Sequence, residues 1–408
     1  MGRKISDGQI INYLKYQAFM NNFVYDIPTK VYFGKDQLSN LGAELKSFGN
    51  RVLLTYGGGS IKRMGLYDKV VEEIKKAGLE LFELSGIEPN PRIGSVREGV
   101  RICKTEKIDV VLAVGGGSTL DAAKFMCAGA HVDHDPWEFF GADAKPIDTA
   151  LPLVTILTLS ATGSEMDTAG VISNPETEDK LGRLAGPIRP RVSFLDPTLT
   201  YSVNAYQTAC GSADILSHLM EVYFDTEQGM DMIDGFMEGM LRAVIKYAPI
   251  AIAEPDNYEA RANLMWASSW AINGFIACGR QCDWSCHPME HELSATYDIT
   301  HGLGLAILTP RWLEYCLDEE RLPRYVQFGV NVFGIDRNLE PMEIAKESIK
   351  RLSDFFFKDL GLKSNFTEIG IKAEDFAMMA AKACRDGNIN GFKTLSAADV
   401  EKIYEMCL

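Results

Sequence analysis

Three of the chain's six histidines lie in one short stretch, at His287, His291 and His301. His287 and His291 are four residues apart, so on a helix both imidazoles project from one face. Neutral imidazole is a common ligand of divalent transition metals, and the cluster therefore predicts a metal site. Any one of these histidines alone would be better explained as a helix cap or a hydrogen-bonded core residue. The spacing leaves open which of the three are ligands.

A carboxylate and an imidazole with the same spacing occur upstream, at Asp214 and His218. On a helix these two side chains share one face and supply half of a divalent-metal site. Two histidines from the later stretch would complete three nitrogen ligands and one oxygen ligand. That combination suits Zn²⁺ or Fe²⁺, whereas Ca²⁺ and Mg²⁺ prefer shells made of oxygen.

Two apolar runs with the character of strands each end in three glycines and a serine, followed by a helical pattern. These turns are Gly57, Gly58, Gly59 and Ser60, and Gly115, Gly116, Gly117 and Ser118. Neither matches Gly-x-Gly-x-x-Gly, but a glycine turn before a helix still exposes backbone N–H groups at the positive end of a helix dipole, which suits a pyrophosphate. A tight turn that needs positive φ is the alternative explanation. Because two such turns occur in one region, we favour a nucleotide site.

A third loop, Thr158 to Glu165, follows the apolar run 153–159 and includes Thr162. Ligands of open α/β sheets bind at the carboxyl ends of the strands, so all three loops are expected at one edge. The first turn carries no acidic residue that would repel the 2′-phosphate of NADP(H), and Lys62 and Arg63 follow it closely. The sequence therefore favours NADP(H), with NAD(H) possible.

The elements that must position these residues change in type along the chain. The first half alternates apolar strands (51–56, 81–84, 109–114, 153–159) with helical patterns, which predicts a largely parallel sheet. After about residue 197, long amphipathic stretches dominate: 205–222, 231–253, 258–279, 340–360 and 373–385. Met232, Phe236, Met240, Trp266 and Trp270 are expected in its core. We predict an α/β nucleotide-binding domain over 20–200 and an all-helical metal- and substrate-binding domain over 201–408, preceded by a leader or added extension at 1–19.

The totals exclude several classes of function. A net charge of −15 argues against nucleic acid or an anionic membrane as partner, and no run of eighteen apolar residues predicts a membrane span. The first nineteen residues lack the features of a signal peptide. Nine cysteines without regular disulfide spacing favour reduced thiols and a cytoplasmic location.

The combination of these motifs resembles the iron-containing (group III) alcohol dehydrogenases, and within them the branch of butanol dehydrogenases and broad aldehyde reductases. The resemblance covers essentially residues 20–408 and rests on Gly115 to Asp121, on Thr158 to Glu165, on Asp214-x-x-x-His218, and on His287-x-x-x-His291 followed by His301. It implies a Rossmann-like parallel-sheet domain followed by an all-helical domain, the fold shared with dehydroquinate synthase. A homodimer is also implied.

Site residues are implied by matching this family's motifs position by position. Asp214, His218, His287 and His301 match the metal ligands, and His291 matches a histidine near the nicotinamide that does not bind the metal. Gly57 to Ser60 match the turn of the NADP-using members. The remaining cofactor positions are Gly115 to Ser118 and Asp121 in the pyrophosphate loop, Thr158 and Thr162 at adenine and ribose, and Lys180 near the phosphates or ribose.

The implied activity is reversible hydride transfer between NAD(P)(H) and a primary alcohol such as butanol, or its aldehyde. The Fe²⁺ or Zn²⁺ ion is expected to act as a Lewis acid on the substrate oxygen, with His291 passing a proton to solvent. The aromatic residues Trp266, Trp270, Phe275 and Trp284 are expected around the metal, with few basic residues.

Two alternatives remain open. One is a polyol-phosphate dehydrogenase or a dehydroquinate-synthase-like enzyme, which needs extra Lys and Arg residues for a phosphorylated substrate. The other is a metal-dependent binding protein without turnover, which the intact ligands, cofactor loops and His291 oppose. Cys278, Cys282 and Cys286 recur at intervals of four and are interpreted as small buried residues on one helix face, not as metal ligands.

Overall fold

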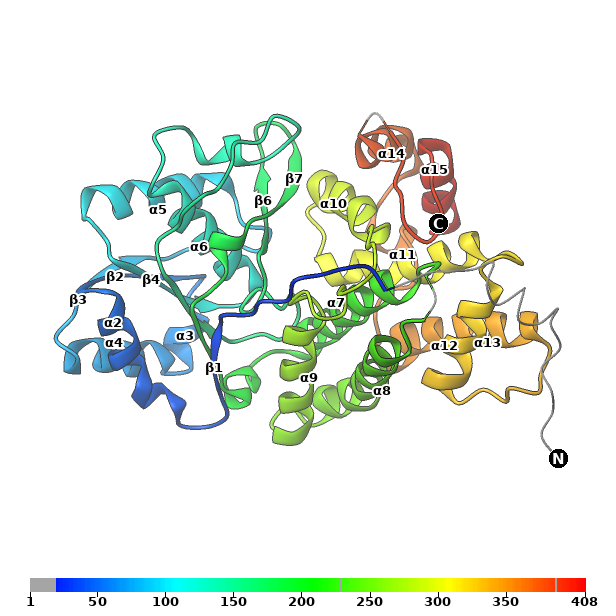
Figure 1. The fold of residues 1–408 in the computed structure, drawn as a ribbon, viewed down its shortest axis with the longest axis horizontal. Helices are drawn as coiled ribbons and strands as arrows, with labels where there is room; N and C mark the ends of the chain where they lie inside the picture. Colours follow the sequence, from blue (N-terminus) through cyan, green and yellow to red (C-terminus); the bar gives the residue numbers. More distant parts are fainter. Residues whose placement is uncertain (1–19, 228, 386) are drawn as a thin grey trace.

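A computed structural model describes residues 20–408 except 228 and 386. The extension predicted at 1–19 therefore lies outside the described residues. The strands and the helices that cover them occupy one end of the elongated molecule, and a helical region occupies the other (Figure 1). Among the described helices, none combines the length and the apolar character that crossing a membrane would require.

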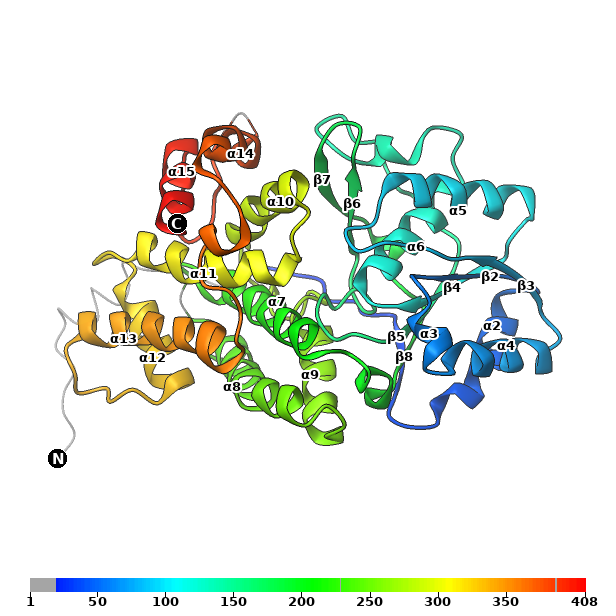
Figure 2. The same cartoon turned by 180° about the vertical axis from the view of Figure 1, so that it is seen from behind.

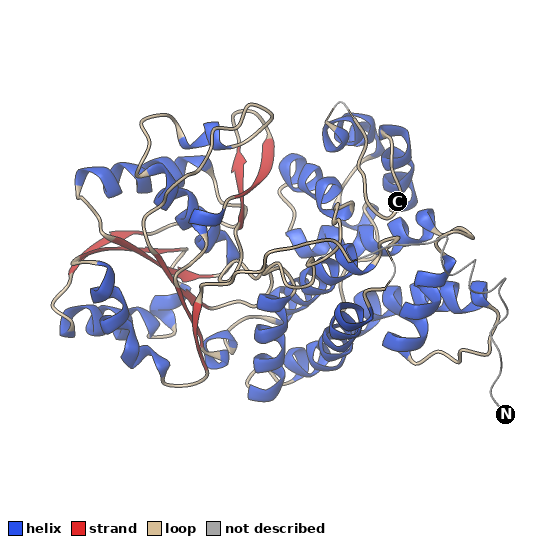
Figure 3. Ribbon diagram, viewed as in Figure 1, coloured by secondary structure: helices blue, strands red, loops and turns tan. Residues whose placement is uncertain are grey.

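One parallel sheet of six strands forms the centre of the α/β region (Figure 3). Its spatial order is β1-β8-β5-β4-β2-β3, and the strands are β1 (Lys30–Phe33), β2 (Arg51–Tyr56), β3 (Glu80–Leu84), β4 (Val110–Gly115), β5 (Leu153–Leu157) and β8 (Val192–Leu195). The strands predicted near 51–56, 81–84, 109–114 and 153–159 are confirmed as β2 to β5. β4, β5 and β8 are buried along their whole length, which explains their continuous apolar runs.

Helices cover both faces of this sheet (Figures 1 and 2). One face is packed by α2 (Leu41–Phe48), α3 (Ser60–Arg63) and α4 (Leu66–Lys76), and the other by α5 (Ile93–Thr105) and α6 (Gly117–Gly129). Val52 and Leu54 belong to the core cluster of the first face, whereas Leu53 belongs to the cluster with Cys103 and Leu120 on the opposite face. Successive strand side chains point to opposite faces, so a buried strand supplies apolar residues to both layers.

A separate antiparallel hairpin, β6 (Ala169–Asn174) and β7 (Asp179–Leu184), follows the third loop. β7 contacts α10 (Cys286–Tyr297) of the helical region, and Figure 1 shows the hairpin facing that helix. The sequence patterns did not predict this hairpin. It brings Lys180 to the helical region.

The helical region is built around α7 (Ala205–Tyr223), which is buried from Thr208 onward and packs against α8 (Asp231–Ala253) and α11 (His301–Cys316). The further helices are α9 (Tyr258–Trp270), α12 (Leu322–Phe333), α13 (Pro341–Asp354), α14 (Phe376–Cys384) and α15 (Ala397–Met406). Short 3₁₀ or π turns are η1 (Gln37–Asn40), η2 (Pro136–Phe139), η3 (Gly186–Ile188), η4 (Pro197–Thr200), η5 (Phe355–Asp359), η6 (Thr367–Ile369) and η7 (Ala373–Asp375).

The helix predicted over 258–279 is too long. α9 ends at Trp270, and residues 271–285 are irregular. Gly274 and Gly279 adopt φ values of +96° and +80°, a left-handed conformation that ends helical structure. Cys278 and Cys282 therefore lie in this segment, and only Cys286 begins a helix, α10. The interpretation of the three cysteines as one helix face is wrong.

Three side chains predicted for the helical core are instead exposed. Met232, Phe236 and Trp266 expose 66%, 37% and 40% of their surface, whereas Met240 is buried. Their helical spacing was correct, but the stripe they form faces outward. Periodicity locates an apolar face without showing what covers it.

Candidate metal and cofactor site

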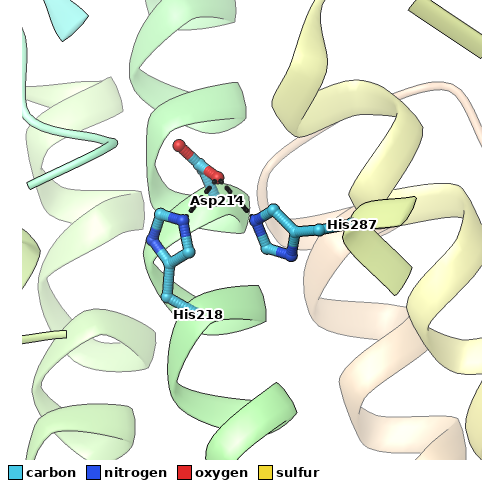
Figure 4. Close-up of side chains that lie close together, drawn as sticks. All are labelled: Asp214, His218 and His287. Carbon is cyan, nitrogen blue, oxygen red and sulfur yellow. Dashed lines mark ion pairs between the residues drawn. The ribbon is translucent and has the colours of Figure 1, made fainter. Parts of the chain in front are cut away.

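Four side chains from three helices converge at the centre of the helical region. Asp214 and His218 lie one turn apart on α7, His287 lies in the first turn of α10, and His301 is the first residue of α11. The Oδ1 atom of Asp214 is 3.6 Å from His218 Nε2, 3.9 Å from His287 Nε2 and 3.6 Å from His301 Nε2. Figure 4 shows the carboxylate of Asp214 between the imidazoles of His218 and His287. The same nitrogen of each ring thus faces one carboxylate oxygen.

This spacing suits a tetrahedral metal ion. Ligand atoms about 2.0–2.2 Å from a tetrahedral Zn²⁺ lie roughly 3.3–3.6 Å from one another, slightly closer than the distances here. Among the described residues, Asp214 Oδ1 and His287 Nε2 are buried without any hydrogen-bond partner. Unpaired polar atoms are costly in a protein interior, and a cation bound between them would satisfy both. The residues therefore fit a divalent ion such as Fe²⁺ or Zn²⁺.

The electrostatics of the cluster also favour a cation. Burial raises the pKa of Asp214 to about 7, and burial lowers the pKa values of His218 and His301 well below the usual range. The imidazoles are therefore neutral near pH 7 and keep a lone pair for coordination. A bound cation would stabilise the ionised carboxylate that burial disfavours.

The short connection between α10 and α11 positions His301 at the cluster. Asp298 adopts a left-handed conformation with φ of +50° and ends α10, and α11 begins three residues later at His301. At the next residue the backbone of α7 passes very close, since a Cβ atom on Gly302 would lie 2.0 Å from the carbonyl oxygen of Cys210. Only glycine permits this approach, which sets the start of α11 against the helix that carries Asp214.

His291 lies beside this cluster. Its ring centroid is 5.7 Å from that of His301 and 6.3 Å from that of His287, and burial lowers its pKa well below the usual range. Ligand atoms of Glu290, His291 and His301 also lie close enough together to form a second candidate metal group. However, Glu290 already accepts hydrogen bonds from His301 Nδ1 and Ser294 Oγ. The group at Asp214 therefore fits a metal ion better, because its acceptor oxygen has no hydrogen-bond partner among the described residues.

Two buried carboxylates at the cluster were not singled out in the sequence. Glu221 accepts a hydrogen bond from Nδ1 of His287, and Glu290 accepts one from Nδ1 of His301. Glu221 lies seven residues after Asp214 on α7, which places both on one helix face. That spacing was the available signal, but the partner of Glu221 is 66 residues away in the sequence.

A pocket of about 660 Å³ opens beside the metal cluster. Its lining combines all three glycine-rich or hydroxyl-rich loops with the start of α11, including Gly58, Gly116, Gly117, Ser118, Thr119, Leu159, Ala161, Thr162, Asp214, His301 and Gly302. The volume lies in the usual range for small-molecule sites. A ligand in this pocket would therefore touch both the glycine loops and two of the proposed metal ligands.

The second glycine turn is built to approach a ligand closely. Gly116 is the N-cap of α6, so the N–H groups of Gly117 and Ser118 lie at the positive end of a thirteen-residue helix. A Cβ atom on Gly117 would lie 2.4 Å from Oγ1 of Thr162, in the third loop. The two loops are in contact only because Gly117 has no side chain.

The other predicted cofactor residues lie at different depths. Five of them belong to the three loops but do not line the pocket: Gly57, Gly59, Ser60, Gly115 and Thr158. Asp121 lies beneath the loops, where its carboxylate accepts hydrogen bonds from Ser164 Oγ at 2.6 Å and from the Val171 N–H at 2.9 Å. Lys180 Nζ is 3.2 Å from Glu290 Oε2 and 3.4 Å from His301 Nδ1, on the metal side of the pocket. The structure thus does not place Lys180 or Asp121 among the pocket-lining residues.

Fewer of the expected aromatic side chains lie against the cluster histidines than the sequence predicted. The Trp284 ring lies 4.4 Å from the His287 ring and 5.4 Å from the His218 ring. Trp266, Trp270 and Phe275 instead pack in a chain of edge contacts with Phe236. In the described part of the chain, none of these three rings makes a ring contact with a histidine of the cluster, whereas Trp284 does.

Comparison with known proteins identifies the relatives of this chain. The family model for iron-containing alcohol dehydrogenase matches residues 28–197, and the model for the C-terminal region of the same family matches residues 208–408. NADH-dependent butanol dehydrogenase A of Clostridium acetobutylicum is 50% identical over 95% of this chain and 99% of its own length. NADPH-dependent aldehyde reductase YqhD of Escherichia coli is 35% identical over 89% of this chain and 93% of its own length.

Solved structures give the same result. The crystal structure of NADH-dependent butanol dehydrogenase A from Thermotoga maritima matches with a TM-score of 0.91 and 37% identity, covering 96% of this chain and all of that one. The fold predicted from the sequence, a Rossmann-like sheet region followed by helices, is confirmed by this match.

Proposed function

The chain belongs to the iron-containing alcohol dehydrogenase family, and on that premise we propose how it works as an NAD(P)(H)-linked alcohol dehydrogenase and aldehyde reductase. It transfers hydride between a primary alcohol, such as butanol, or its aldehyde and the nicotinamide cofactor. The observation that supports this most is the convergence of three imidazole Nε2 atoms on Asp214 Oδ1 at the wall of the loop-lined pocket.

Asp214, His218, His287 and His301 would hold one divalent ion, Fe²⁺ or Zn²⁺. Such an ion supplies Lewis acidity that polarises the oxygen of an alcohol or aldehyde. The chain's own contribution is to hold three imidazoles and one carboxylate in place, and burial lowers the pKa values of His218 and His301, which keeps the lone pairs of these two rings free of protons. The adjoining pocket provides room for the substrate and the cofactor beside these ligands.

His291 would accept and release the proton that the reaction exchanges with solvent. Its ring centroid is 5.7 Å from that of His301, and burial lowers its pKa, so the ring is neutral near pH 7 and keeps a lone pair that can take up a proton in passing it to solvent. It therefore complements the metal ligands without being one of them.

We propose that the enzyme accepts NADPH as well as NADH. The turn from Gly57 to Ser60 has no acidic side chain to repel a 2′-phosphate. The Lys62 ammonium lies over the rings of Tyr56 and Tyr67, whereas an Arg63 nitrogen lies 3.9 Å from the position of a Cβ atom on Gly59. Arg63 is thus the basic residue that we place at the phosphate.

A phosphorylated substrate is the less favoured alternative. Within the described part of the chain, the lining of the pocket includes a single Lys or Arg residue, Arg92, and its guanidinium is paired with Asp298 at 3.0 Å. A dehydroquinate-synthase-like or polyol-phosphate enzyme needs cations free to bind a phosphate.

The test combines metal analysis with rates. Protein purified without oxygen is expected to contain about one Fe²⁺ or Zn²⁺ per chain and to oxidise NADPH and NADH when butanal is supplied. A polyol phosphate, given as the control substrate, is expected to produce no comparable rate. Turnover of the polyol phosphate without turnover of butanal would contradict the proposed substrate class.

We propose a homodimer with its interface on an exposed apolar surface. Val24 exposes 94% of its surface and Phe23 exposes 52%, and Phe33 contacts Trp266 at a ring distance of 5.5 Å. Scattered single apolar side chains are ordinary, but Trp266 is linked through Trp270 to the exposed Phe236 by ring contacts of 5.6 and 5.8 Å. Light scattering after size-exclusion chromatography would give twice the chain mass, and Trp266→Glu would lower it.

The predicted division into residues 20–200 and 201–408 also remains a proposal. It is supported by the end of the sheet at Leu195 and the start of α7 at Ala205. A cytoplasmic location is supported by the nine cysteines, all of which lie in the described region and are unpaired.

A further inference from the structure

The three imidazoles of the cluster differ in the hydrogen-bond partner of Nδ1, the ring nitrogen that does not face Asp214. His287 Nδ1 is 2.7 Å from Glu221 Oε1, and His301 Nδ1 is hydrogen-bonded to Glu290. Among the described residues, His218 Nδ1 is buried without a partner. A carboxylate on another helix therefore holds the ring orientation of His287 and of His301. The ring of His218 has no such hydrogen bond.

Glu221 makes the most extensive of these contacts. Its Oε1 atom accepts hydrogen bonds from both Nδ1 and the backbone N–H of His287, each at 2.7 Å. Its Oε2 atom accepts from the backbone N–H groups of Ser285 and Cys286, the latter at 3.1 Å. The side chain is 1% exposed. One carboxylate on α7 thus caps the first turn of α10 and holds the ring of a residue in that turn.

Four N–H groups surround the Glu221 carboxylate, and both of its oxygens must accept hydrogen bonds from them. Three are backbone N–H groups, which can only donate, so both oxygens must accept. The proton of His287 then resides on Nδ1, and the lone pair of Nε2 faces Asp214 Oδ1. No side chain of α10 itself caps this helix, since Ser285 makes no side-chain cap. The position of His287 relative to Asp214 therefore depends on α7, which carries both Asp214 and Glu221.

We propose that Glu221 is a positioning residue of the metal centre, which holds His287 in the metal-binding tautomer and orientation. This inference rests on the proposed metal site. Hydrogen-bonded carboxylates behind a ligand histidine raise its basicity and restrict the ring, and their loss typically lowers metal affinity by about 10–100-fold.

Glu221→Gln tests the proposal because an amide cannot accept at both ends. If the Gln oxygen replaces Oε1, its NH₂ group faces the N–H groups of Ser285 and Cys286. If the amide is reversed, the NH₂ group faces both donors of His287. Either orientation loses two of the four hydrogen bonds, while the volume of the side chain is unchanged.

Glu238→Gln is the matched control. Glu238 is also buried in the helical region, and its Oε1 accepts from Tyr223, Gln327 and Asn331 at 2.8–3.0 Å. It contacts none of the four proposed ligands. If the loss of any buried carboxylate weakened metal binding, Glu238→Gln would show it as well. If the loss acts through His287, only Glu221→Gln would show it.

The measurement is the competition for Zn²⁺ between the purified enzyme and a chromophoric chelator, with circular dichroism to check folding. Glu221→Gln is expected to hold Zn²⁺ about 10–100-fold more weakly than the wild type, and Glu238→Gln within about twofold. In protein produced with Co²⁺, the visible absorption of the ion is expected to change in Glu221→Gln alone, because it reports ligand geometry and not fold stability.

Unchanged Zn²⁺ affinity and Co²⁺ absorption in folded Glu221→Gln would overturn the role of Glu221. If that variant does not fold, Glu221→Asp replaces it, since this keeps an acceptor at both oxygens but withdraws them from His287. Wild-type affinity and absorption in Glu221→Asp would equally overturn the role. Failure of the wild type itself to bind a divalent metal would instead refute the proposed metal site.

Discussion

The metal cluster and the glycine-lined edge of the pocket lie side by side but are built in opposite ways. The cluster consists of side chains that must be present: one carboxylate and three imidazoles, with two further carboxylates behind them. The edge consists of side chains that must be absent, as at Gly117, where a Cβ atom would lie 2.4 Å from Thr162. The first region therefore fails when atoms are removed, and the second when atoms are added.

A second contrast concerns buried carboxylates. Burial raises the pKa of both Asp214 and Glu165 to about 7. Asp214 has three imidazoles around it and is expected to be neutralised by a metal ion. Glu165, the last residue of the third loop, accepts a hydrogen bond from Ser269 and has an Oε2 without a hydrogen-bond partner among the described residues, and its raised pKa means that a proton neutralises it below about pH 7. The negative charge of a buried carboxylate is thus expected to be neutralised by a metal ion at Asp214 and by a proton at Glu165.

The largest effect is expected from Asp214→Ala. Without the only oxygen ligand, the three imidazoles lose the atom on which they converge, so bound metal and turnover should disappear together. Elemental analysis and rates of NADPH oxidation with butanal measure both. Asp256→Ala, at an exposed position after α8, serves as the control and should keep both properties. Full metal content and activity in Asp214→Ala would refute the ligand set.

Gly117→Ala should weaken NADPH binding at the glycine-lined edge of the pocket and leave the metal content unchanged. The added Cβ atom would collide with Thr162 Oγ1, and overpacking of this kind costs about 1–3 kcal/mol, which corresponds to roughly 5–150-fold weaker NADPH binding if it acts on the bound state. Fluorescence titration with NADPH measures the loss, and metal content should not change.

Two variants sharpen this second prediction. Gly186→Ala adds a Cβ atom that would meet nothing within 4 Å and should leave NADPH binding unchanged. Adding Thr162→Ala to Gly117→Ala removes the colliding hydroxyl and should restore part of the affinity. Equal losses in Gly117→Ala and Gly186→Ala would show that the contact with Thr162 is not the cause.

The pH dependence of stability should distinguish Glu165 from the metal cluster. Burial raises the pKa of Glu165 from 4.5 to about 7, so the folded state holds this proton more tightly than the unfolded state. The stabilisation from this group is therefore complete below about pH 4.5 and is lost as pH rises to about 7, an effect of about 3 kcal/mol.

Urea unfolding of metal-loaded protein between pH 5 and pH 8 measures this slope. Glu165→Gln keeps the shape of the protonated acid and has no titration, so its free energy of unfolding should fall less over the same range. An identical pH slope in the wild type and Glu165→Gln would exclude Glu165 as the source.

The smallest effect is expected at the mouth of the pocket, between the two regions. Arg92 and Asp298 form an ion pair at 3.0 Å, and Asp298 also accepts from Asn90 Nδ2 at 2.9 Å. The Asp298 side chain is 60% exposed, so a double-mutant cycle with Arg92→Ala and Asp298→Ala should give a coupling energy of only about 0.2–1 kcal/mol. A coupling above this range would show that the contact links the two regions more strongly than solvent exposure suggests.

Much of the fold was predictable because each local pattern had one dominant cause. The apolar runs of β2, β4 and β5 are buried on both faces, and glycine turns end β2 and β4. The amphipathic stretches at 205–222 and 231–253 match α7 and α8 closely. The hairpin of β6 and β7 was missed because its pairing lies outside the main sheet and β7, with only Lys180 buried, is not an apolar run.

Local patterns were insufficient where the environment of a face mattered. The stripe that includes Met232 and Trp266 has helical spacing but is exposed. The helix expected over 258–279 ended early because Gly274 and Gly279 adopt left-handed conformations that the apolar periodicity does not record. In both cases the sequence predicted an apolar face without specifying its surroundings.

By itself, the sequence determined the chemical groups of the site: a carboxylate and an imidazole one helical turn apart at Asp214 and His218, a group of three histidines, and glycines at the ends of two strands. Only the tertiary structure decided how they act. It directs Nε2 of three rings toward one oxygen, places Glu221 behind His287 across 66 residues, and turns Lys180 toward the metal cluster. Spacing along one helix is fixed by local geometry, whereas contacts between distant elements depend on how whole helices pack.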